Sequence, residues 1–308
     1  MSLRSNEMLA QSVHKAVFPA AGFGTSFLPA TKSQPKEMLP LVDKPIIQYA
    51  VEEASASGLE NIIIITGRGK SAIEQHFDAS FELERTLETR GQQKDLSLVR
   101  AISDLINVSY IRQSAPLGVG HAVKLARPLV GNEPFAVVLP DVVVRADVLC
   151  LKSLVDVYGD LGHAVIAVME VPAQELTHYG VVDVIPEEFN GTTNRLFRVR
   201  SVIEKPPPGQ APSNLAMIGR YIFPATIFDC LDSTDPDSSG ELQLTDGIAA
   251  LLEREQVYAY RFEGSFYDIR DKLSFLKAVV ELTLGREDLG VSFREYLRSL
   301  EFRKSEGV

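Results

Sequence analysis

Short apolar runs recur along the first half of the chain, separated by amphipathic stretches. The runs are rich in valine and isoleucine, which is typical of strands buried on both faces of a sheet, and the stretches between them suit covering helices. We predict strands at Ala16–Phe18, Ile62–Ile65, Val108–Ile111, Phe135–Leu139 and Ala164–Val168. This order predicts a Rossmann-like α/β fold with a mixed, mostly parallel sheet flanked by helices.

Helical patterns are clearest in two regions. Lys44–Ser57 carries a proline in its first turn and ends before Gly58, which predicts a crossover helix. From Asp271 onward the apolar residues follow a helical period, and a second helical segment is predicted to begin near Val291. This tail is either an oligomer contact or a packed cap.

The pattern changes after His163, where the predicted strands become shorter. They are Gly180–Ile185, Phe197–Ile203 and Ala216–Phe223. The run Pro206–Gly209 is a turn or loop, because prolines cannot join a central hydrogen-bonded ladder. We expect these strands to form a small β-rich extension or lid.

Composition narrows the class of protein. The 308 residues are 45% hydrophobic and 23% charged, as in soluble globular proteins. A formal net charge of -10 argues against a nucleic-acid-binding surface. The longest apolar runs fall far short of the roughly 20 residues needed to cross a bilayer. We therefore expect no nucleic-acid partner and no membrane partner.

The expected domain division has three parts. Residues 1–14 are polar and lack the apolar core of a signal peptide, so we expect a flexible leader. Residues 15–280 form the main domain, and residues 281–308 form a C-terminal helical tail. Cys150 and Cys230 have no CxxC spacing and lie in apolar surroundings, which favours reduced core residues and a cytoplasmic location.

A glycine loop, Ala20–Thr25, follows the first predicted strand. Its small residues allow backbone N–H groups to approach a phosphate or a base closely. A dinucleotide fingerprint would need a small residue where Phe27 stands. A Walker A motif ending at Gly69–Ser71 would need a glycine where Ile64 stands. Hydride chemistry and a P-loop kinase or ATPase are therefore disfavoured.

The loop continues into Lys32–Pro40, a proline-stiffened segment with two lysines and one carboxylate. A loop of fixed shape can hold cations over a phosphate at little entropic cost. Further along, Asp141 ends a predicted buried strand, at the edge where open α/β sheets place their ligand sites. A carboxylate there is either a turn residue or a ligand for Mg²⁺ beside substrate phosphates.

With these residues in view, the chain resembles the bacterial UTP:glucose-1-phosphate uridylyltransferases, within the sugar nucleotidyltransferase superfamily. The resemblance covers roughly residues 15 to 280 and rests on several separate motifs. They are the glycine loop with Pro35–Pro40, Val42–Tyr49, Arg112–Gln113, Leu117–Ala122, Val138–Asp141, Tyr179–Val182, Ile203–Pro206, Gly219–Tyr221 and Glu241–Asp246. It implies a nucleotide-diphospho-sugar transferase fold whose β-rich extension binds the sugar.

The resemblance implies transfer of a uridylyl group from UTP to α-D-glucose 1-phosphate, giving UDP-glucose and pyrophosphate by direct in-line attack. It implies Mg²⁺ held by Asp141 and Asp268 as the cofactor, and a homo-oligomer, either a dimer or a tetramer. Lys36 is expected at the UTP phosphates and Lys205 at the glucose 1-phosphate, so Lys36, Lys205 and Asp141 are the implied catalytic residues.

The resemblance also implies substrate contacts. Glu37, Gln113 and Gly118 are expected at the uracil edge; an amide such as that of Gln113 can both donate to and accept from a base. Glu204 is expected at the sugar hydroxyls, and Gly180 allows close backbone approach to the hexose. The remaining implied contacts belong to the glycine loop, at Ala20, Ala21, Gly22 and Gly24.

The chain departs from the family pattern at three positions. Ser26 stands where the glycine loop usually carries an arginine, Val142 where a second acidic residue is common, and Arg270 where a glycine is usual. A serine hydroxyl carries no charge to neutralise a triphosphate, and Arg270 is a candidate substitute. Two hypotheses remain: an active uridylyltransferase, or a catalytically weakened paralogue that binds nucleotide sugar and modulates an active homologue. The preference for UTP over dTTP is also open.

Overall fold

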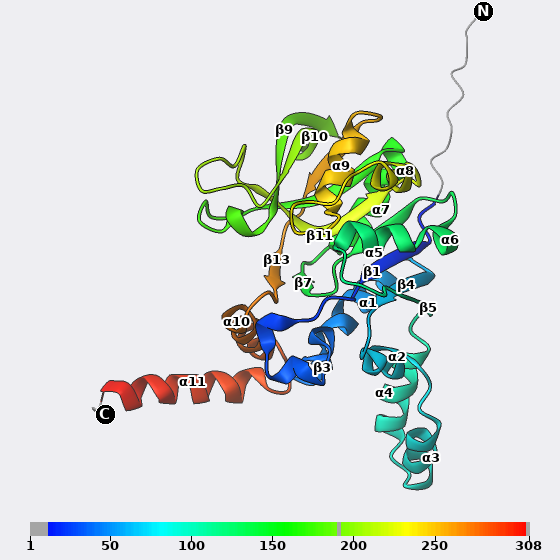
Figure 1. Cartoon of the computed structure of the whole chain (residues 1–308). Helices are drawn as coiled ribbons and strands as arrows, with labels where there is room; N and C mark the ends of the chain where they lie inside the picture. Colours follow the sequence, from blue (N-terminus) through cyan, green and yellow to red (C-terminus); the bar gives the residue numbers. More distant parts are fainter. Residues whose placement is uncertain (1–11, 190–191, 306–308) are drawn as a thin grey trace, which may run out of the picture.

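The computed structural model describes residues 12–189 and 192–305. Nine strands form one sheet in the order β5-β4-β1-β6-β11-β8-β12-β10-β9 (Figure 1). These strands are β1 (Lys15–Pro19), β4 (Asn61–Thr66), β5 (Asn107–Arg112), β6 (Phe135–Val138), β8 (Ala164–Glu170), β9 (Gly180–Phe189), β10 (Thr192–Glu204), β11 (Leu215–Phe223) and β12 (Val257–Arg261). Two small ribbons pair β2 (Pro40–Leu41) with β3 (Lys44–Pro45) and β7 (Val142–Arg145) with β13 (Ser265–Asp268).

Helices cover both faces of this sheet. The α-helices are α1 (Ile46–Ala56), α2 (Ser71–Phe77), α3 (Phe81–Thr89), α4 (Gln93–Ser103), α5 (Val119–Leu125), α6 (Arg127–Val130), α7 (Cys150–Leu161), α8 (Thr226–Asp232), α9 (Leu244–Leu252), α10 (Lys272–Leu284) and α11 (Gly290–Ser305). Short 3₁₀ turns lie at Thr25–Phe27, Ala30–Lys32, Lys36–Met38 and Leu176–His178. No helix in the described part of the chain is long and apolar enough to cross a membrane.

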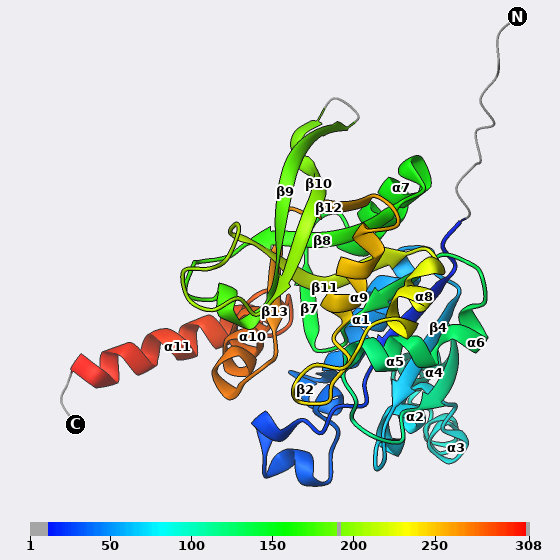
Figure 2. The same ribbon diagram turned by 45° about the horizontal axis from the view of Figure 1, so that its top comes forward.

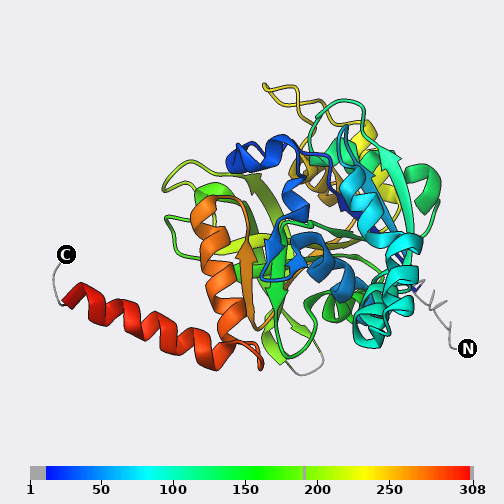
Figure 3. The ribbon, with the colours of Figure 1, turned by 90° about the horizontal axis from the view of Figure 1, so that it is seen from below.

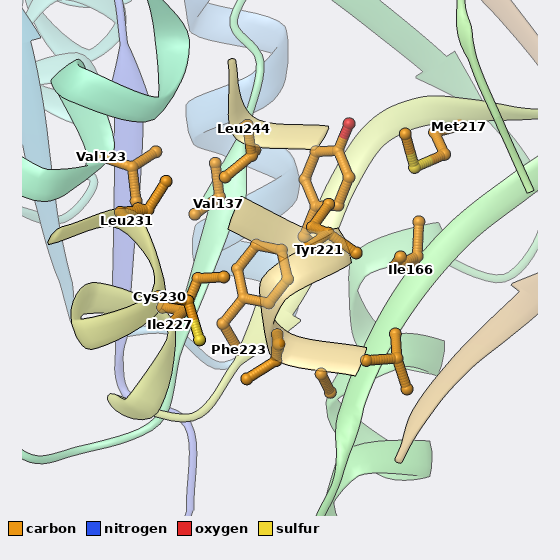
Figure 4. Packing of buried hydrophobic residues seen from close by; sticks show 14 of the residues in the cluster. Val123, Val137, Ile166, Met217, Tyr221, Phe223, Ile227, Cys230, Leu231 and Leu244 are labelled. Carbon is orange, nitrogen blue, oxygen red and sulfur yellow. The ribbon is translucent and has the colours of Figure 1, made fainter. Parts of the chain in front are cut away.

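Alternation along the strands divides the core into two layers. Val17 packs with α5, α8 and α9 on one face of the sheet, whereas its neighbour Phe18 packs with α1, α2 and α7 on the other. Figure 4 shows part of the first layer, where Phe223 of β11 lies between Tyr221 of the same strand and Ile227 of α8. The sheet is therefore buried on both faces, as the apolar runs predict.

The prediction of a mixed, mostly parallel α/β sheet is confirmed, because β10 and β11 run opposite to the other strands of the sheet. One part of it is wrong. The strand predicted at Ala216–Phe223 is not part of an extension but lies at the centre of the sheet as β11, between β6 and β8. Alternation could not locate it, because all nine of its residues are buried. The β9–β10 hairpin does extend beyond the body (Figure 2).

Element boundaries differ slightly from those predicted. The crossover helix begins at Ile46 rather than Lys44, because Lys44 and Pro45 pair with β2. The helices predicted near Asp271 and Val291 are α10 and α11, and residue 280 falls inside α10. Figure 3 shows α11 leaving the body on the side away from α2–α4. Cys150 and Cys230 are buried and unbonded, as expected. Of the predicted leader, residues 1–14, the first eleven residues lie outside the described part of the chain.

Candidate active site

Three adjoining cavities lie along one edge of the sheet. The glycine-loop cavity, of about 380 Å³, is lined by Ala21–Phe23, Thr31–Pro35, Gly67–Lys70 and Gln113–Pro116. The carboxylate cavity, of about 410 Å³, is lined by residues that include Asp141, Gly180, Glu204, Lys205, Thr245, Asp268 and Arg270. A smaller cavity shares Ala21 and Gln113 with the first and Val119 and Glu241 with the second. Together they form a continuous binding region at the carboxyl ends of β1, β4, β5 and β6.

The glycine loop packs directly against the lysine loop. Gly24 has a φ of +63°, and a Cβ there would lie 2.9 Å from the Cβ of Lys36. The Thr31 hydroxyl donates to the Gly24 carbonyl at 2.7 Å. Ala20 is fully buried and its N–H donates to the Ile65 carbonyl at 2.8 Å. Ala20 and Gly24 therefore fix the loop, while Ala21 and Gly22 line the cavities.

Glu37 is buried and its carboxylate meets a partner that sequence reasoning missed. The Lys70 ammonium donates to both oxygens of Glu37, at 2.9 and 2.7 Å. Lys70 lines the glycine-loop cavity, whereas Glu37 does not. Gly69–Ser71 has the form of a Walker A ending, and nothing in its spacing points to Glu37. In this structure Glu37 positions Lys70 at the cavity wall.

Gln113 lies between two of the cavities. Its Nε2 lies 3.2 Å from the Gly118 carbonyl and 2.8 Å from Nδ1 of His121. If Nε2 donates, Nδ1 of His121 must accept, so the imidazole carries its proton on Nε2. Gly118 has a φ of +91°, and a Cβ there would lie 2.6 Å from the Leu242 carbonyl oxygen. Gly118 thus lets the Leu117–Ala122 motif approach the Glu241–Asp246 motif.

Lys36, Asp141 and Asp268 meet at the carboxylate cavity. The Lys36 Nζ lies 2.6 Å from Oδ2 of Asp141. The β7–β13 ribbon begins directly after Asp141, pairs Val142 with Asp268, and is continued by a 2.9 Å hydrogen bond from the Ile269 N–H to the Asp141 carbonyl. Two carboxylates that are distant in sequence are therefore held side by side.

The charges of this group are strongly coupled. Burial opposes ionisation of Asp141, but the Lys36 ammonium and its hydrogen bond lower the pKa of Asp141 below its ordinary value. Burial and the nearby charge of Asp141 raise the pKa of Asp268 to about 6. Burial works against the charge of Lys36, yet Asp141 raises its pKa. The negative charge of the two carboxylates is therefore only partly neutralised by Lys36.

This donor set fits a divalent cation of the Mg²⁺ type. Asp141 and Asp268 offer hard oxygen donors to one cavity. Burial, followed by the charge of Asp141, raises the pKa of Asp268, and a bound cation would oppose both effects. The described residues contain no group of three or more potential metal ligands among His, Cys, Asp and Glu. The pair is therefore not a closed protein cage, which suits Mg²⁺ bound by one or two carboxylates together with substrate phosphates.

Glu204 and Lys205 also line the carboxylate cavity. The Lys205 Nζ lies 3.3 Å from Oε1 of Glu204, and the Thr245 hydroxyl donates to Oε2 of Glu204 at 2.5 Å. Lys205 has a φ of +42°, a left-handed conformation that turns the chain at the end of β10. A Cβ on Gly180 would lie 2.1 Å from the Met217 Cε, so that position has room for glycine alone unless Met217 moves.

The departures from the family pattern fall in different places. Ser26 is exposed and lines none of the three cavities. Arg270 lines the carboxylate cavity, where it donates to the Tyr179 hydroxyl at 2.9 Å, lies 3.5 Å from Asp268 and pairs with Glu175. Val142 is buried at the start of β7. Arg270 thus adds positive charge beside Asp268 in the carboxylate cavity, and it does not line the glycine-loop cavity.

Comparison with known proteins yields consistent matches. The family described as nucleotidyl transferase matches residues 15–284. A Staphylococcus epidermidis protein named UTP–glucose-1-phosphate uridylyltransferase is 47% identical over 291 residues, which cover 94% of this chain and 99% of that protein. A Bacillus subtilis protein of the same name is 48% identical over 279 residues, covering 91% of this chain and 94% of that protein.

Solved structures are similar as well. A UTP-bound UGPase from Acinetobacter baumannii superposes with a TM-score of 0.83 at 42% identity, covering 94% of this chain and 99% of that chain. A UDP-glucose pyrophosphorylase complexed with UDP-glucose gives a TM-score of 0.79 at 39% identity, covering 89% of this chain and all of that one. Both structures carry a uridine nucleotide, by their descriptions.

Proposed function

Because this chain belongs to the nucleotidyl transferase family, we propose that its particular reaction is the Mg²⁺-dependent transfer of a uridylyl group from UTP to α-D-glucose 1-phosphate, giving UDP-glucose and pyrophosphate. The observation that carries the proposal is that Asp141 and Asp268 line the carboxylate cavity while the Lys36 ammonium contacts Asp141. One cavity offers loop backbone and amide groups, which suit a base, and the other offers a lysine and carboxylates, which suit a sugar phosphate. The names of the similar proteins support the same substrates.

The reaction needs no protein nucleophile. A phosphate oxygen of glucose 1-phosphate attacks the α-phosphorus of UTP, the bond from that phosphorus to the bridging oxygen breaks, and pyrophosphate leaves. The barrier falls when both substrates are held in line and the charge on the transferring group is matched by fixed cations. Lys36, which contacts Asp141, would stabilise the α-phosphate, and Lys205, which lines the same carboxylate cavity as Asp141, would hold the glucose 1-phosphate.

Uracil would occupy the glycine-loop end. Ala21 and Gly22 offer backbone groups there, Gln113 offers an amide, and Gly118 allows close approach, while Ala20, Gly24 and Glu37 hold these groups and Lys70 in place. The glucose hydroxyls would meet Glu204 and the backbone at Gly180. Asp141 and Asp268 would hold Mg²⁺, which would supply positive charge to the substrate phosphates.

A second candidate is a weakened paralogue that binds nucleotide sugar and modulates an active homologue. It is motivated by Ser26 alone, which replaces the usual arginine. Four charged residues of the proposed chemistry, Lys36, Asp141, Lys205 and Asp268, are present and converge, so we favour the active enzyme.

We also propose that the protein forms a homo-oligomer, a dimer or a tetramer. Large apolar side chains are exposed on α10 and α11: Leu273 by 62%, Leu276 by 58%, Val291 by 65% and Tyr296 by 55%. Exposed apolar groups gathered on neighbouring helices are typical of association surfaces. Analytical ultracentrifugation tests this, and a monomer at micromolar concentration would contradict it.

One assay tests the enzyme proposal. Purified protein is given UTP, glucose 1-phosphate and Mg²⁺, and pyrophosphate release is followed, with dTTP and CTP in parallel reactions. The proposal expects steady turnover that is fastest with UTP. Release no faster than that of a Lys205→Ala control would leave the weakened paralogue as the better description.

A further inference from the structure

Arg220 is a fully buried arginine that the proposed chemistry does not use. It belongs to β11, opposite Val138, the last residue of β6, and it is 0% exposed. Its Nε and Nη2 lie 3.0 and 2.9 Å from Oε2 of Glu53, which is itself 8% exposed on α1. A buried charge pair is expensive to desolvate, and an apolar side chain of similar volume would often stabilise a fold equally well. Stability alone therefore does not explain the pair.

The remaining donors of Arg220 are directed at the turn that carries Asp141. Nη2 donates to the Val142 carbonyl at 2.7 Å, and Nη1 donates to the Leu139 carbonyl at 3.1 Å. Nη1 also lies 3.2 Å from its neighbouring Gly219 carbonyl. All five N–H groups of the guanidinium thus have an acceptor, and two of those acceptors flank Asp141 on either side.

The surrounding packing reinforces this arrangement. The Leu139 N–H donates to the Gly219 carbonyl at 2.9 Å, and a Cβ on Gly219 would lie 2.8 Å from the Cβ of Leu139. Glu53 accepts a second hydrogen bond, at 3.1 Å, from the Leu151 N–H in the first turn of α7. The pair therefore ties the Asp141 turn to β11, to α1 and to α7 at once.

We propose that Arg220 and Glu53 form a positioning unit that fixes the turn from Leu139 to Val142 and so sets where the Asp141 carboxylate lies. Neither residue lines the carboxylate cavity, so both act through the turn. The β7–β13 ribbon starts at Val142, which pairs with Asp268, so the same unit also sets the position of Asp268. Its catalytic consequence rests on the proposed uridylyltransferase reaction, whereas its effect on the turn does not.

Two substitutions separate positioning from simple stability. Arg220→Lys keeps the charge but provides three N–H groups in place of five, so it cannot reach all the carbonyls. Glu53→Gln keeps the shape and an acceptor for the Leu151 N–H but loses the charge that orients Arg220. Phe223→Leu is the matched control: it changes a fully buried side chain further along the same strand, away from the turn.

The first readout is hydrogen–deuterium exchange of the ligand-free proteins. We expect both Arg220→Lys and Glu53→Gln to exchange faster at residues 139–145 and 265–270, with residues 61–66 unchanged. Phe223→Leu should leave residues 139–145 as in the natural chain. Unchanged exchange at 139–145 in both variants would overturn the proposal even if the natural chain turns over no substrate.

The second readout is steady-state kinetics at varied Mg²⁺. Loss of groups that orient metal-binding residues typically costs about 10–100-fold in activity or metal affinity. We expect a loss of that size in kcat, a higher Mg²⁺ requirement and a nearly unchanged KM for UTP. Phe223→Leu should lower Tm while keeping kcat. If Phe223→Leu loses as much kcat as these variants at the same fall in Tm, the Arg220–Glu53 pair has only a structural role. If Arg220→Lys does not fold, Glu53→Gln decides the outcome.

Discussion

The Lys36 ammonium lies 2.6 Å from the Asp141 carboxylate, so the cation that would stabilise a transferring phosphoryl group is already placed against a candidate metal ligand. The arrangement orders both side chains before any substrate binds. A pre-ordered cation costs no reorganisation at the moment of reaction, which is the main source of electrostatic catalysis.

Lys36→Met should abolish most of the activity. The substitution keeps the length of the side chain but removes the ammonium, and losses of single stabilising groups of this kind are about 10²–10³-fold in kcat. Pyrophosphate release measures the effect. Lys152→Met is a suitable control, because Lys152 pairs with Asp156 on the exposed surface of α7 and should keep the natural rate. Equal rates for the two variants would contradict the role of Lys36.

Removal of divalent metal should stop turnover, and added Mg²⁺ should restore it. Asp141→Asn and Asp268→Asn should each raise the Mg²⁺ concentration needed for half-maximal rate, since each removes one charged oxygen donor from the pair. Titration of activity with Mg²⁺ after chelation provides the measurement. A full rate in excess EDTA would show that the reaction needs no divalent metal.

Ser26→Arg should increase the rate. An arginine on the glycine loop would add a charge-assisted contact to the triphosphate, and such contacts are about twice as strong as neutral hydrogen bonds. The gain should appear in kcat rather than only in KM for UTP. Ser97→Arg, at an exposed position of α4 that lines none of the three cavities, is the control for added charge alone. An unchanged rate with nucleotide still bound would show that another cation already fills the role.

UTP affinity should be constant at neutral pH and fall in acid. Burial lowers the pKa of His121 below the ordinary 6.5, and Lys124 lowers it further, so the imidazole is neutral at pH 7 and charges only below that value. Once protonated, His121 can no longer accept from Gln113, and the amide must turn. Calorimetric titration of UTP between pH 5 and 8 measures this. In His121→Gln the fall in acid should disappear; its persistence would assign the titration to another group.

Lys70→Met should destabilise the fold strongly. It leaves the Glu37 carboxylate buried without its partner, and breaking a buried pair from one side costs about 3–5 kcal/mol. The double substitution Lys70→Met, Glu37→Met should recover much of that free energy of unfolding, because no unpaired charge remains. Urea unfolding of both variants gives the comparison. A double variant less stable than Lys70→Met would contradict this account.

Much of the architecture could be predicted from the sequence, because strands buried on both faces produce plain apolar runs such as Ile62–Ile65. The location of β11 could not, since its nine buried residues give no alternation and its partners, β6 and β8, are distant in the chain. Pattern alone identifies a strand but not its neighbours.

Some residues of the candidate site could likewise be predicted from the sequence and others could not. Lys36, Asp141, Glu204 and Lys205 stand in recognisable motifs; the structure brings the last three to one cavity and places Lys36 against Asp141. Sequence reasoning missed Lys70 and Glu53, because each acts through a partner that is distant in the sequence. Lys70 pairs with Glu37, and Glu53 pairs with Arg220. Neither partnership leaves a trace in local spacing.

The β7–β13 ribbon has a consequence for how the protein folds during its synthesis. Val142 and Asp268 are separated by more than a third of the chain, and their pairing is what places Asp141 beside Asp268. Pairing between such distant segments forms late, because closing a long loop costs conformational entropy before the paired strands can stabilise it. On the ribosome, the sheet from β1 to β6 can begin to fold while the second aspartate has yet to be synthesised. The candidate metal-binding pair is therefore complete only after Asp268 has been synthesised, and a chain truncated before that residue lacks it.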